Sequence, residues 1–161
     1  MQHHQILIVM SENQVDEIKN CISRYLGIRE HSKLELIIKL NQKKFNKEMI
    51  NKCLNEFIEK GYQSDERYAK SYARSKYNIQ KGQNYIVSNL QQNGITKTII
   101  NKILLMYNDD DWENAATIAL EKKVISKLKI ANDIQKKQKY FLHNRGFLPQ
   151  TINKVLNKLW K

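Results

Sequence analysis

The chain has 161 residues and carries 28 Lys and Arg against 16 Asp and Glu, a formal net charge of +12. Its single Pro, its five Gly and its many Leu, Ile, Lys, Asn and Gln residues favour long helices joined by tight turns over strands. The two cysteines, Cys21 and Cys53, form no CxxC pair, which argues against a zinc site, a redox dithiol or a secreted disulfide framework and fits a reducing cytoplasm.

Residues 1–13 are expected to form an N-terminal arm or tail. Their apolar stretch, Ile6 to Met10, is too short to cross a bilayer, and no Lys or Arg precedes it as a signal peptide would require. The stretch fits both a short extended arm and a disordered tail. We expect no contact with a membrane.

One short phrase occurs three times in the chain, at offsets of 50 and then 52 residues. Such a period predicts three tandem copies of one helical unit. A unit of this size cannot bury a core by itself, so neighbouring copies must stack, and we predict an all-α fold of three stacked three-helix repeats. The expected repeats are residues 14–62, 63–109 and 110–161. The copies of the phrase run from Leu40 to Leu54, from Leu90 to Leu104 and from Leu142 to Leu156.

The first helices of the repeats contain small faces over which another helix can approach closely. These faces are formed by Ala69, Ala73, Ala115, Ala116 and Ala119. Gly27 and Gly61 are expected to be C-caps, with Tyr62 packing back on its helix. The first helices of the three repeats are predicted at about Val15 to Leu26, Asp65 to Asn78 and Asp111 to Val124.

The second helix of the first repeat begins with a capping box formed by Ser32 and Glu35. The turns into the third helices of the second and third repeats contain Gly94 and Gly146, which suit the left-handed conformation that ends a helix. The first repeat has Lys44 in this place, which costs about 1 kcal/mol if the same turn is kept.

In the third helix of each repeat, apolar residues recur at i, i+3, i+4 and i+7, which predicts one inward face. Cys53 stands where the other copies have Ile103 and Val155, so it is interpreted as a small core residue rather than a reactive thiol. Pro149 lies in the first turn of the last helix, where no N–H hydrogen bond is lost. The predicted inward residues are Ile50, Cys53, Leu54 and Phe57; Ile100, Ile103, Leu104 and Tyr107; and Ile152, Val155, Leu156 and Leu159.

The sequence contains no catalytic constellation. Asp109, Asp110 and Asp111 could be read as a divalent-metal site, but acidic residues that begin a helix satisfy free N–H groups, and we favour that interpretation. His31 and His143 lie in different repeats without an obvious nucleophile, and no Gly-rich phosphate loop is present. We therefore expect a protein that is not an enzyme and that needs no cofactor and no metal.

The third repeat is the cationic one. Residues 122–161 contain eleven Lys or Arg and a single acidic residue, Asp133, whereas residues 1–121 are nearly balanced. A polyanion, either nucleic acid or an acidic protein surface, is the natural partner, although a solvated face that serves solubility is the alternative. Tyr140 and Phe141 lie beside this basic run. Its candidate binding residues are Lys122, Lys123, Lys127, Lys129, Lys136, Lys137, Lys139 and Arg145.

The order and spacing of several short stretches resemble the RecX family of bacterial recombination regulators over about residues 15–161. In the first repeat these are Tyr25-Leu26, Arg29 to Ser32 and Glu35-Leu36; in the second, Gly61-Tyr62, Asp65-Glu66-Arg67-Tyr68-Ala69, Lys81-Gly82, Ile86, Leu90 and Gly94-Ile95; and in the third, Ala115, Ala119, Lys122-Lys123, Lys136 to Lys139, Leu142 and Arg145-Gly146-Phe147. Two places depart from the family pattern. Gln63 and Ser64 replace an apolar-acidic pair, and Asn78 and Ile79 lie where an arginine usually leads into Lys81-Gly82.

The resemblance implies an elongated, curved, solenoid-like molecule, of either hand, that regulates the RecA recombinase. Members of the family lie in the groove of the RecA filament on single-stranded DNA and block filament growth, and thereby suppress ATP hydrolysis, strand exchange and co-protease activity. The resemblance thus implies a monomeric, cytoplasmic protein of DNA repair, DNA recombination and the SOS response. A stacked array offers a long concave surface for such a groove.

Two rival functions stay open from the sequence. One is a stand-alone module that binds single- or double-stranded DNA directly and without sequence preference, which the repeats and the charge permit equally. The other is a helical-repeat adaptor for some other acidic protein.

Overall fold

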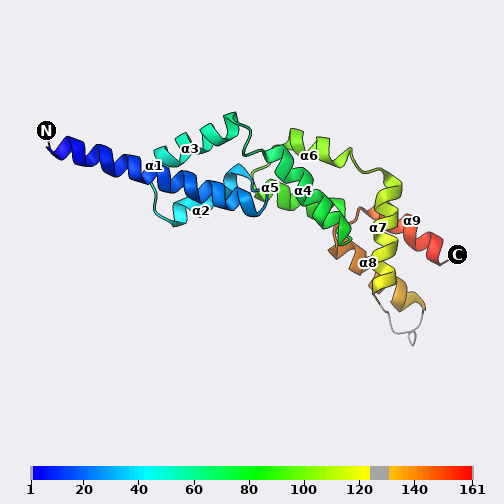
Figure 1. The fold of residues 1–161 in the computed structure, drawn as a ribbon. Helices are drawn as coiled ribbons and strands as arrows, with labels where there is room; N and C mark the ends of the chain where they lie inside the picture. Colours follow the sequence, from blue (N-terminus) through cyan, green and yellow to red (C-terminus); the bar gives the residue numbers. More distant parts are fainter. Residues whose placement is uncertain (1, 124–130, 161) are drawn as a thin grey trace. The chain divides into compact units, whose positions relative to one another are not determined.

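The computed structural model describes the backbone of residues 2–123 and 131–160 and the side chains of residues 13–123 and 133–160. Within these residues the chain forms nine α-helices and no strand, which confirms the all-α prediction (Figure 1). The helices are α1 (Gln2–Ile28), α2 (Lys33–Gln42), α3 (Lys47–Glu59), α4 (Asp65–Asn78), α5 (Gln83–Gln92), α6 (Lys97–Leu104), α7 (Asp109–Lys122), α8 (Ala131–Asn144) and α9 (Pro149–Leu159).

The chain divides into two compact units. The first unit comprises the residues up to Tyr68 together with Asn93–Ile95, and the second comprises Ala69–Gln92 and the residues from Thr96 onward. Helix α4 therefore begins in the first unit and continues in the second. A three-residue turn that is distant in sequence belongs to the first unit because it packs on α2.

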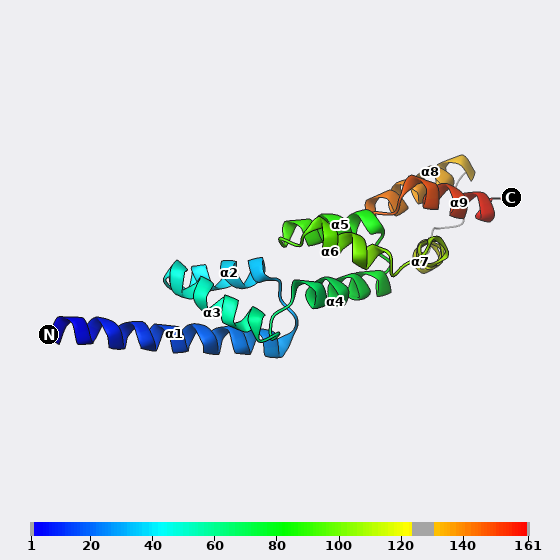
Figure 2. The same cartoon turned by 90° about the horizontal axis from the view of Figure 1, so that it is seen from above.

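The core of the first unit lies between α1, α2 and α3. Figure 2 shows α2 and α3 along the C-terminal half of α1. The predicted capping box is present, since the Ser32 side chain accepts a hydrogen bond from the Glu35 amide and the Glu35 side chain accepts one from the Ser32 amide. The buried residues that fill this core are Ile18, Cys21, Ile22, Leu36, Leu40, Ile50, Cys53 and Leu54. The interpretation of Cys53 as a core residue is confirmed.

The first helix is longer than the sequence suggested. It begins at Gln2, so Ile6 to Met10 are helical rather than an extended arm or a disordered tail. No Pro or Gly interrupts residues 2–26, and adding a residue to an existing helix costs less than starting a new one. Gly27 was wrongly predicted as a C-cap, because α1 continues to Ile28.

The helix end at Gly61 is as predicted. Gly61 has a φ of 73°, and the amides of Gly61 and Tyr62 donate to the carbonyl oxygens of Ile58 (2.9 Å) and Phe57 (2.8 Å). The ring of Tyr62 meets that of Phe57 edge-on, with a centroid distance of 5.8 Å. This is the Schellman motif with its usual hydrophobic contact.

The second unit buries apolar faces of α4 to α9. Its small alanine faces are buried, and α9 packs on both α7 and α8. An aromatic cluster of Tyr77, Tyr107 and Trp112 joins α4 to the start of α7, with ring centroids 4.9 to 5.5 Å apart. The Tyr77 hydroxyl donates to the Asp111 carbonyl oxygen at 3.0 Å. The main buried residues are Ala69, Ala73, Ile86, Leu90, Ile100, Ile103, Trp112, Ala115, Ala116, Ala119, Leu142, Phe147, Ile152 and Val155.

The inward faces of the third helices are confirmed in most positions but not in two. Helix α6 ends at Leu104, so Tyr107 lies beyond it and packs in the aromatic cluster instead. Leu159 is 54% exposed, because it is the last residue of α9 and no further helix covers it. Helix α7 begins at Asp109 rather than Asp111, and Val124, the predicted end, lies outside the described residues.

Candidate nucleic-acid interface

The N-terminus of α2 is held by side chains that follow α3. Gln63, only 3% exposed, donates its amide Nε2 to the His31 carbonyl oxygen at 3.1 Å and to Asp65 Oδ1 at 2.9 Å. The same Asp65 oxygen accepts the backbone N–H of Lys33 at 2.8 Å. Asp65 therefore satisfies an otherwise free amide at the start of α2, and we refer to these contacts as the first junction.

Three more side chains, those of Arg67, Tyr68 and His31, belong to the first junction. Arg67 donates through Nε to Glu30 Oε1 at 2.8 Å and through Nη2 to the Tyr62 carbonyl oxygen at 2.9 Å. Tyr68 is buried. His31, also buried, donates through Nδ1 to the Arg29 carbonyl oxygen at 3.0 Å, and burial lowers the pKa of its imidazole.

The N-terminus of α5 is held by backbone instead. The amide of Gly82 donates to the Arg145 carbonyl oxygen at 2.8 Å, and the amide of Asn84 donates to the Gly146 carbonyl oxygen at 2.9 Å. A Cβ on Gly82 would overlap the backbone of Gly146 and Phe147. In Figure 2 the turn between α8 and α9 meets the start of α5 at this second junction.

Arg145 completes the second junction. Its guanidinium donates to the carbonyl oxygens of Ile79 and Gln80, the latter at 2.7 Å, and burial lowers the pKa of Arg145. Lys81 lies over the ring of Tyr85 at 4.4 Å, and Phe147 is 1% exposed. The family-motif residues of both junctions thus hold helices together.

The space around the left-handed turns explains why the second and third repeats have Gly there and the first has Lys. Gly94 and Gly146 have φ values of 77° and 87°, as predicted, and Lys44 keeps the same conformation at 62°. A Cβ on Gly94 would lie 3.0 Å from Leu34, and one on Gly146 would lie 2.5 Å from the Tyr85 amide. We call Leu34 and Tyr85 the docking positions, because the following repeat's turn lies on them. Lys44 belongs to the first repeat, and no earlier repeat lies within the described residues.

The basic run of the third repeat divides into engaged and unengaged cations. Lys122 donates to Gln80 Oε1 at 3.0 Å, and Lys123 lies over the Phe141 ring at 4.2 Å. Lys122, Lys123 and Arg145 therefore make contacts inside the protein. Lys127 and Lys129 lie outside the described residues.

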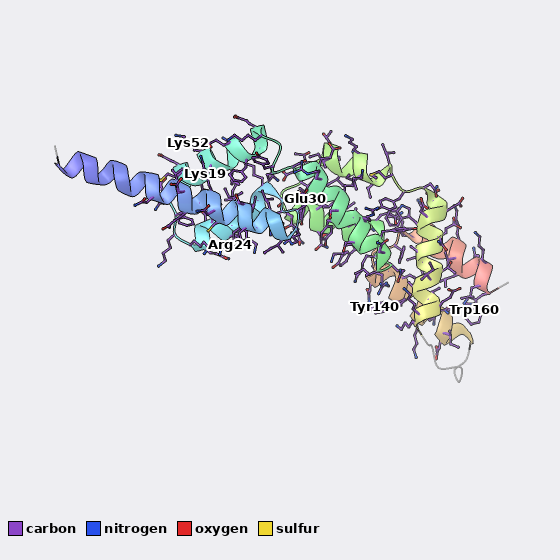
Figure 3. The ribbon with its side chains drawn as sticks, viewed as in Figure 1. Lys19, Arg24, Glu30, Lys52, Tyr140 and Trp160 are labelled. Atoms are coloured by element: carbon purple, nitrogen blue, oxygen red, sulfur yellow. The ribbon has the colours of Figure 1, made fainter. Side chains whose placement is uncertain are left out.

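Lys136, Lys137 and Lys139 are exposed on α8 and make no ion pair or hydrogen bond with any described residue. Tyr140, labelled in Figure 3, follows them on the same helix and is 70% exposed. We call these four residues the α8 lysine face. Here the structure brings together four residues that the sequence had placed beside one another.

The described lysines of α9, in contrast, form ion pairs. Glu113, which is 8% exposed, accepts hydrogen bonds from Lys158 at 2.7 Å and from Lys154 at 3.0 Å. These hydrogen bonds lower the pKa of the Glu113 carboxyl, and the bond to Glu113 raises the pKa of Lys154. Lys154 and Lys158 were not among the binding residues predicted from the sequence.

The acidic start of α7 is a helix cap, as favoured. Asn108 Oδ1 accepts the Asp111 amide at 2.9 Å, and Asp111 Oδ2 accepts the Asn108 amide at 2.8 Å. Among the described side chains, no three His, Cys, Asp or Glu residues lie close enough to hold a metal ion. His143 is exposed on α8.

The chain is similar to known proteins over most of its length. A family model described as "RecX, second three-helix domain" matches residues 64–104. The chain is 35% identical over 137 residues to the "Regulatory protein RecX" of Legionella pneumophila (strain Corby), covering 84% of this chain and 90% of that protein. This chain belongs to the RecX family. The RecX protein of Chlorobium phaeobacteroides (strain BS1) is 32% identical over 140 residues, which cover 86% of this chain and 90% of that protein.

Two RecX crystal structures agree with the fold. The structure of RecX from Lactobacillus salivarius has a TM-score of 0.81 at 25% identity and covers 92% of this chain and 97% of that one. A structure titled "Crystal structure of regulatory protein RecX" has a TM-score of 0.85 at 19% identity, covering 98% of this chain and 78% of that one, and shows the fold alone. The Legionella and Chlorobium relatives are named as regulatory proteins, which supports a RecX regulatory role for this chain.

Several residues of this RecX-family chain carry contacts that sequence reasoning missed. Gln63 departs from the family pattern, yet it is the buried centre of the first junction. Gln80 has a left-handed φ of 54° and contacts both Lys122 and Arg145. A polar residue in the short link between two helices was the one available signal for both. In the part of the chain that the structure describes, no helix has the length and apolar content to span a bilayer.

Proposed function

We propose that this chain is a negative regulator of the RecA recombinase. It binds the RecA filament on single-stranded DNA along the filament groove and blocks filament growth, and through this it suppresses ATP hydrolysis, strand exchange and co-protease activity. The observation that carries the proposal is the identity to RecX regulatory proteins over nine-tenths of their length. A cytoplasmic monomer active in DNA repair, recombination and the SOS response is part of the same proposal.

The α8 lysine face supports a polyanionic partner. Its three lysines keep their charges available, whereas the α9 lysines are paired with Glu113 and Lys123 lies over Phe141. Phosphate groups or acidic side chains of a filament can therefore approach α8 without first breaking an internal ion pair. In this proposal the third repeat faces the filament's acidic groups or its DNA.

The first two repeats are proposed to dock on RecA protomers. The family-motif residues Asp65, Arg67, Gly82 and Gly146 hold the two junctions, so we assign them to folding rather than to partner contact. Weak contacts spread over several protomers add up when they are linked in one molecule.

The test is the DNA-dependent ATP hydrolysis of RecA with this protein added well below stoichiometric amounts. We expect inhibition, because one regulator that blocks filament growth affects many protomers. Unchanged hydrolysis would refute the proposal. A variant with Lys136, Lys137 and Lys139 all replaced by Gln should inhibit less.

A matched control separates position from total charge. Replacing Lys43, Lys47 and Lys52 by Gln removes the same three charges from exposed positions in the first unit. If the α8 lysine face is the polyanion-binding surface, this control should keep much more affinity for nucleic acid than the α8 variant. Equal losses would show that only net charge matters.

The same face favours a second candidate, a stand-alone nucleic-acid-binding protein. Under that function, affinity for DNA without RecA is strong and falls steeply with salt, because bound phosphates release counterions. A flat salt titration would exclude it. Pull-down from a bacterial lysate with and without nuclease treatment separates both candidates from an adaptor for another acidic protein.

A further inference from the structure

We propose that Tyr140 is a base-stacking platform in a single-stranded DNA site on the α8 lysine face. The inference rests on the proposed function, in which the third repeat faces a filament that contains single-stranded DNA. It goes further by assigning the ligand of this surface, the residue that stacks and the residues that hold phosphate.

Tyr140 lies between two surface hollows. One, of about 360 Å³, is lined by Lys123, Lys136, Lys137 and Tyr140. The other, of about 300 Å³, is lined by Lys136, Lys139, Tyr140, His143, Pro149 and Ile152. Tyr140 and Lys136 line both hollows, so an exposed aromatic ring has an open, cation-edged space on each side.

The neighbouring aromatic residue, Phe141, makes the cation–π contacts that Tyr140 lacks. Phe141 is half-buried, with Lys123 Nζ 4.2 Å and Arg145 Cζ 5.5 Å from its ring centroid. The ring of Phe141 therefore already interacts with two cations of the protein itself. Tyr140 makes no such contact with any described residue and is 70% exposed, which leaves its ring open for an external π-system.

The charge around Tyr140 is suited to phosphate. Lys136 and Lys137 lie one helical turn before Tyr140, and His143 lies one turn after it, on the same side of α8. The one acidic residue of α8, Asp133, lines neither hollow. No carboxylate in the two hollows competes with a bound phosphate.

A lysine groove with an exposed aromatic ring matches the physical requirements of single-stranded DNA. The lysines contact the backbone without regard to sequence, and an unpaired base can stack on the ring because every base has a π-face. Bases within a duplex are already stacked and cannot reach a ring on a helix surface in this way. The site is therefore expected to prefer single strands over duplexes.

The experiment compares the full-length protein with Tyr140→Ala, using a fluorescently labelled oligo(dT) and a duplex of equal length in anisotropy titrations. Stacking is worth about 1–3 kcal/mol per base, so the affinity of Tyr140→Ala for oligo(dT) should fall by about 5- to 150-fold. Affinity for the duplex should change little. Tyr140→Phe keeps the ring and should bind oligo(dT) nearly as well as the unmodified chain.

Salt titrations separate the stacking residue from the phosphate contacts. Tyr140→Ala should keep the slope of log affinity against log salt, whereas the triple Gln variant of Lys136, Lys137 and Lys139 should reduce its steepness by about 2, from roughly 0.7 per phosphate contact. Tyr62→Ala is the matched control, since Tyr62 is 61% exposed but belongs to the first unit. It should bind oligo(dT) like the unmodified chain, and far-UV circular dichroism checks that each variant is folded.

Equal binding of oligo(dT) by Tyr140→Ala and the unmodified chain would overturn the inference, as would equal losses for single strand and duplex. Loss of RecA inhibition by Tyr140→Ala with unchanged oligo(dT) binding would also overturn it and would assign Tyr140 to protein contact. The outcomes distinguish this inference from the proposed function: a chain that fails to inhibit RecA but binds oligo(dT) through Tyr140 refutes only the proposed function.

Discussion

The helices α2 and α5 occupy the same place in successive repeats, yet their N-termini are satisfied by different chemistry. At α2 the Lys33 amide donates to the carboxylate of Asp65, and Gln63 links that carboxylate to the His31 carbonyl oxygen. At α5 the amide of Gly82 donates to a backbone carbonyl oxygen. Side chains form the first junction, and backbone forms most of the second.

The difference determines what each junction can tolerate. A side-chain junction can lose one hydrogen bond and keep its spacing, and its ionisable groups make it sensitive to pH. A junction made of backbone contains no side chain that can change its rotamer to make room. Any added side-chain atom must therefore push the two backbone segments apart. The second junction should therefore be the more sensitive to steric change, and the first the more sensitive to pH.

The largest effect is expected from Gly82→Ala. The new methyl group overlaps the backbone of Gly146 and Phe147, and we expect the free energy of unfolding to fall by about 3 kcal/mol. Gly82 belongs to the second unit and Gly27 to the first, so urea unfolding is followed by far-UV circular dichroism, which reports on the helices of both units. Gly27→Ala is the control: no atom lies within 4 Å of its added Cβ inside α1, so it should stabilise the chain by about 0.5–1 kcal/mol. Equal stability of the two variants would contradict the comparison.

Asp65→Ala should have the next largest effect. It leaves the Lys33 amide and the buried Gln63 amide without their acceptor, which costs about 2 kcal/mol. Urea unfolding followed by far-UV circular dichroism measures the change. Asp110→Ala, at an exposed position in the first turn of α7, should stay within about 0.5 kcal/mol of the unmodified chain. A similar loss in both variants would mean that Asp65 acts only through its charge.

A smaller effect is expected from lowering the pH. Burial lowers the pKa of His31 below its ordinary value of 6.5, and this effect outweighs the hydrogen bond to the Arg29 carbonyl oxygen, which acts in the opposite direction. The unfolded chain then binds more protons at this site than the folded chain, so stability is constant above about pH 7 and falls as the pH drops through 6.5. Urea midpoints at pH 7.5 and 5.5 measure the decrease. In His31→Gln most of it should vanish, and an unchanged decrease would place its origin elsewhere.

The smallest effect on stability is expected away from both junctions. Replacing Lys136, Lys137 and Lys139 by Gln should change the free energy of unfolding by no more than about 0.5 kcal/mol, since exposed charges contribute little to folding. Thermal unfolding followed by circular dichroism is the measurement. A large loss would show that these lysines are structural rather than available to a partner.

Elements set by local sequence could be predicted well. The period of the repeated phrase, the capping box at Ser32, and the left-handed turns at Gly94 and Gly146 depend on residues close in sequence, and each is present. The α4 boundaries were predicted to the residue for the same reason. Gly27 failed because a Gly inside a helix and a Gly just beyond its end look alike in sequence.

The contacts between residues far apart along the chain could not be predicted from a single sequence. The residues next to Asp65 do not indicate that it caps a helix more than thirty residues earlier. The residues next to Glu113 do not indicate that it pairs with α9 lysines 41 and 45 residues later. The basic run was therefore predicted as one surface, whereas its members divide into engaged and exposed cations. The sequence placed the candidate site on the third repeat, and packing determined which of its lysines stay free of contacts with other described residues.

The docking positions also bear on how many units can be joined in series. Counting by the offset of the repeated phrase, α8 has Lys136 where α2 has Leu34, and Lys137 where α5 has Tyr85. A fourth copy, or the turn of a second molecule, would have to desolvate two ammonium groups there without compensation. Head-to-tail association of two molecules through this contact is therefore disfavoured.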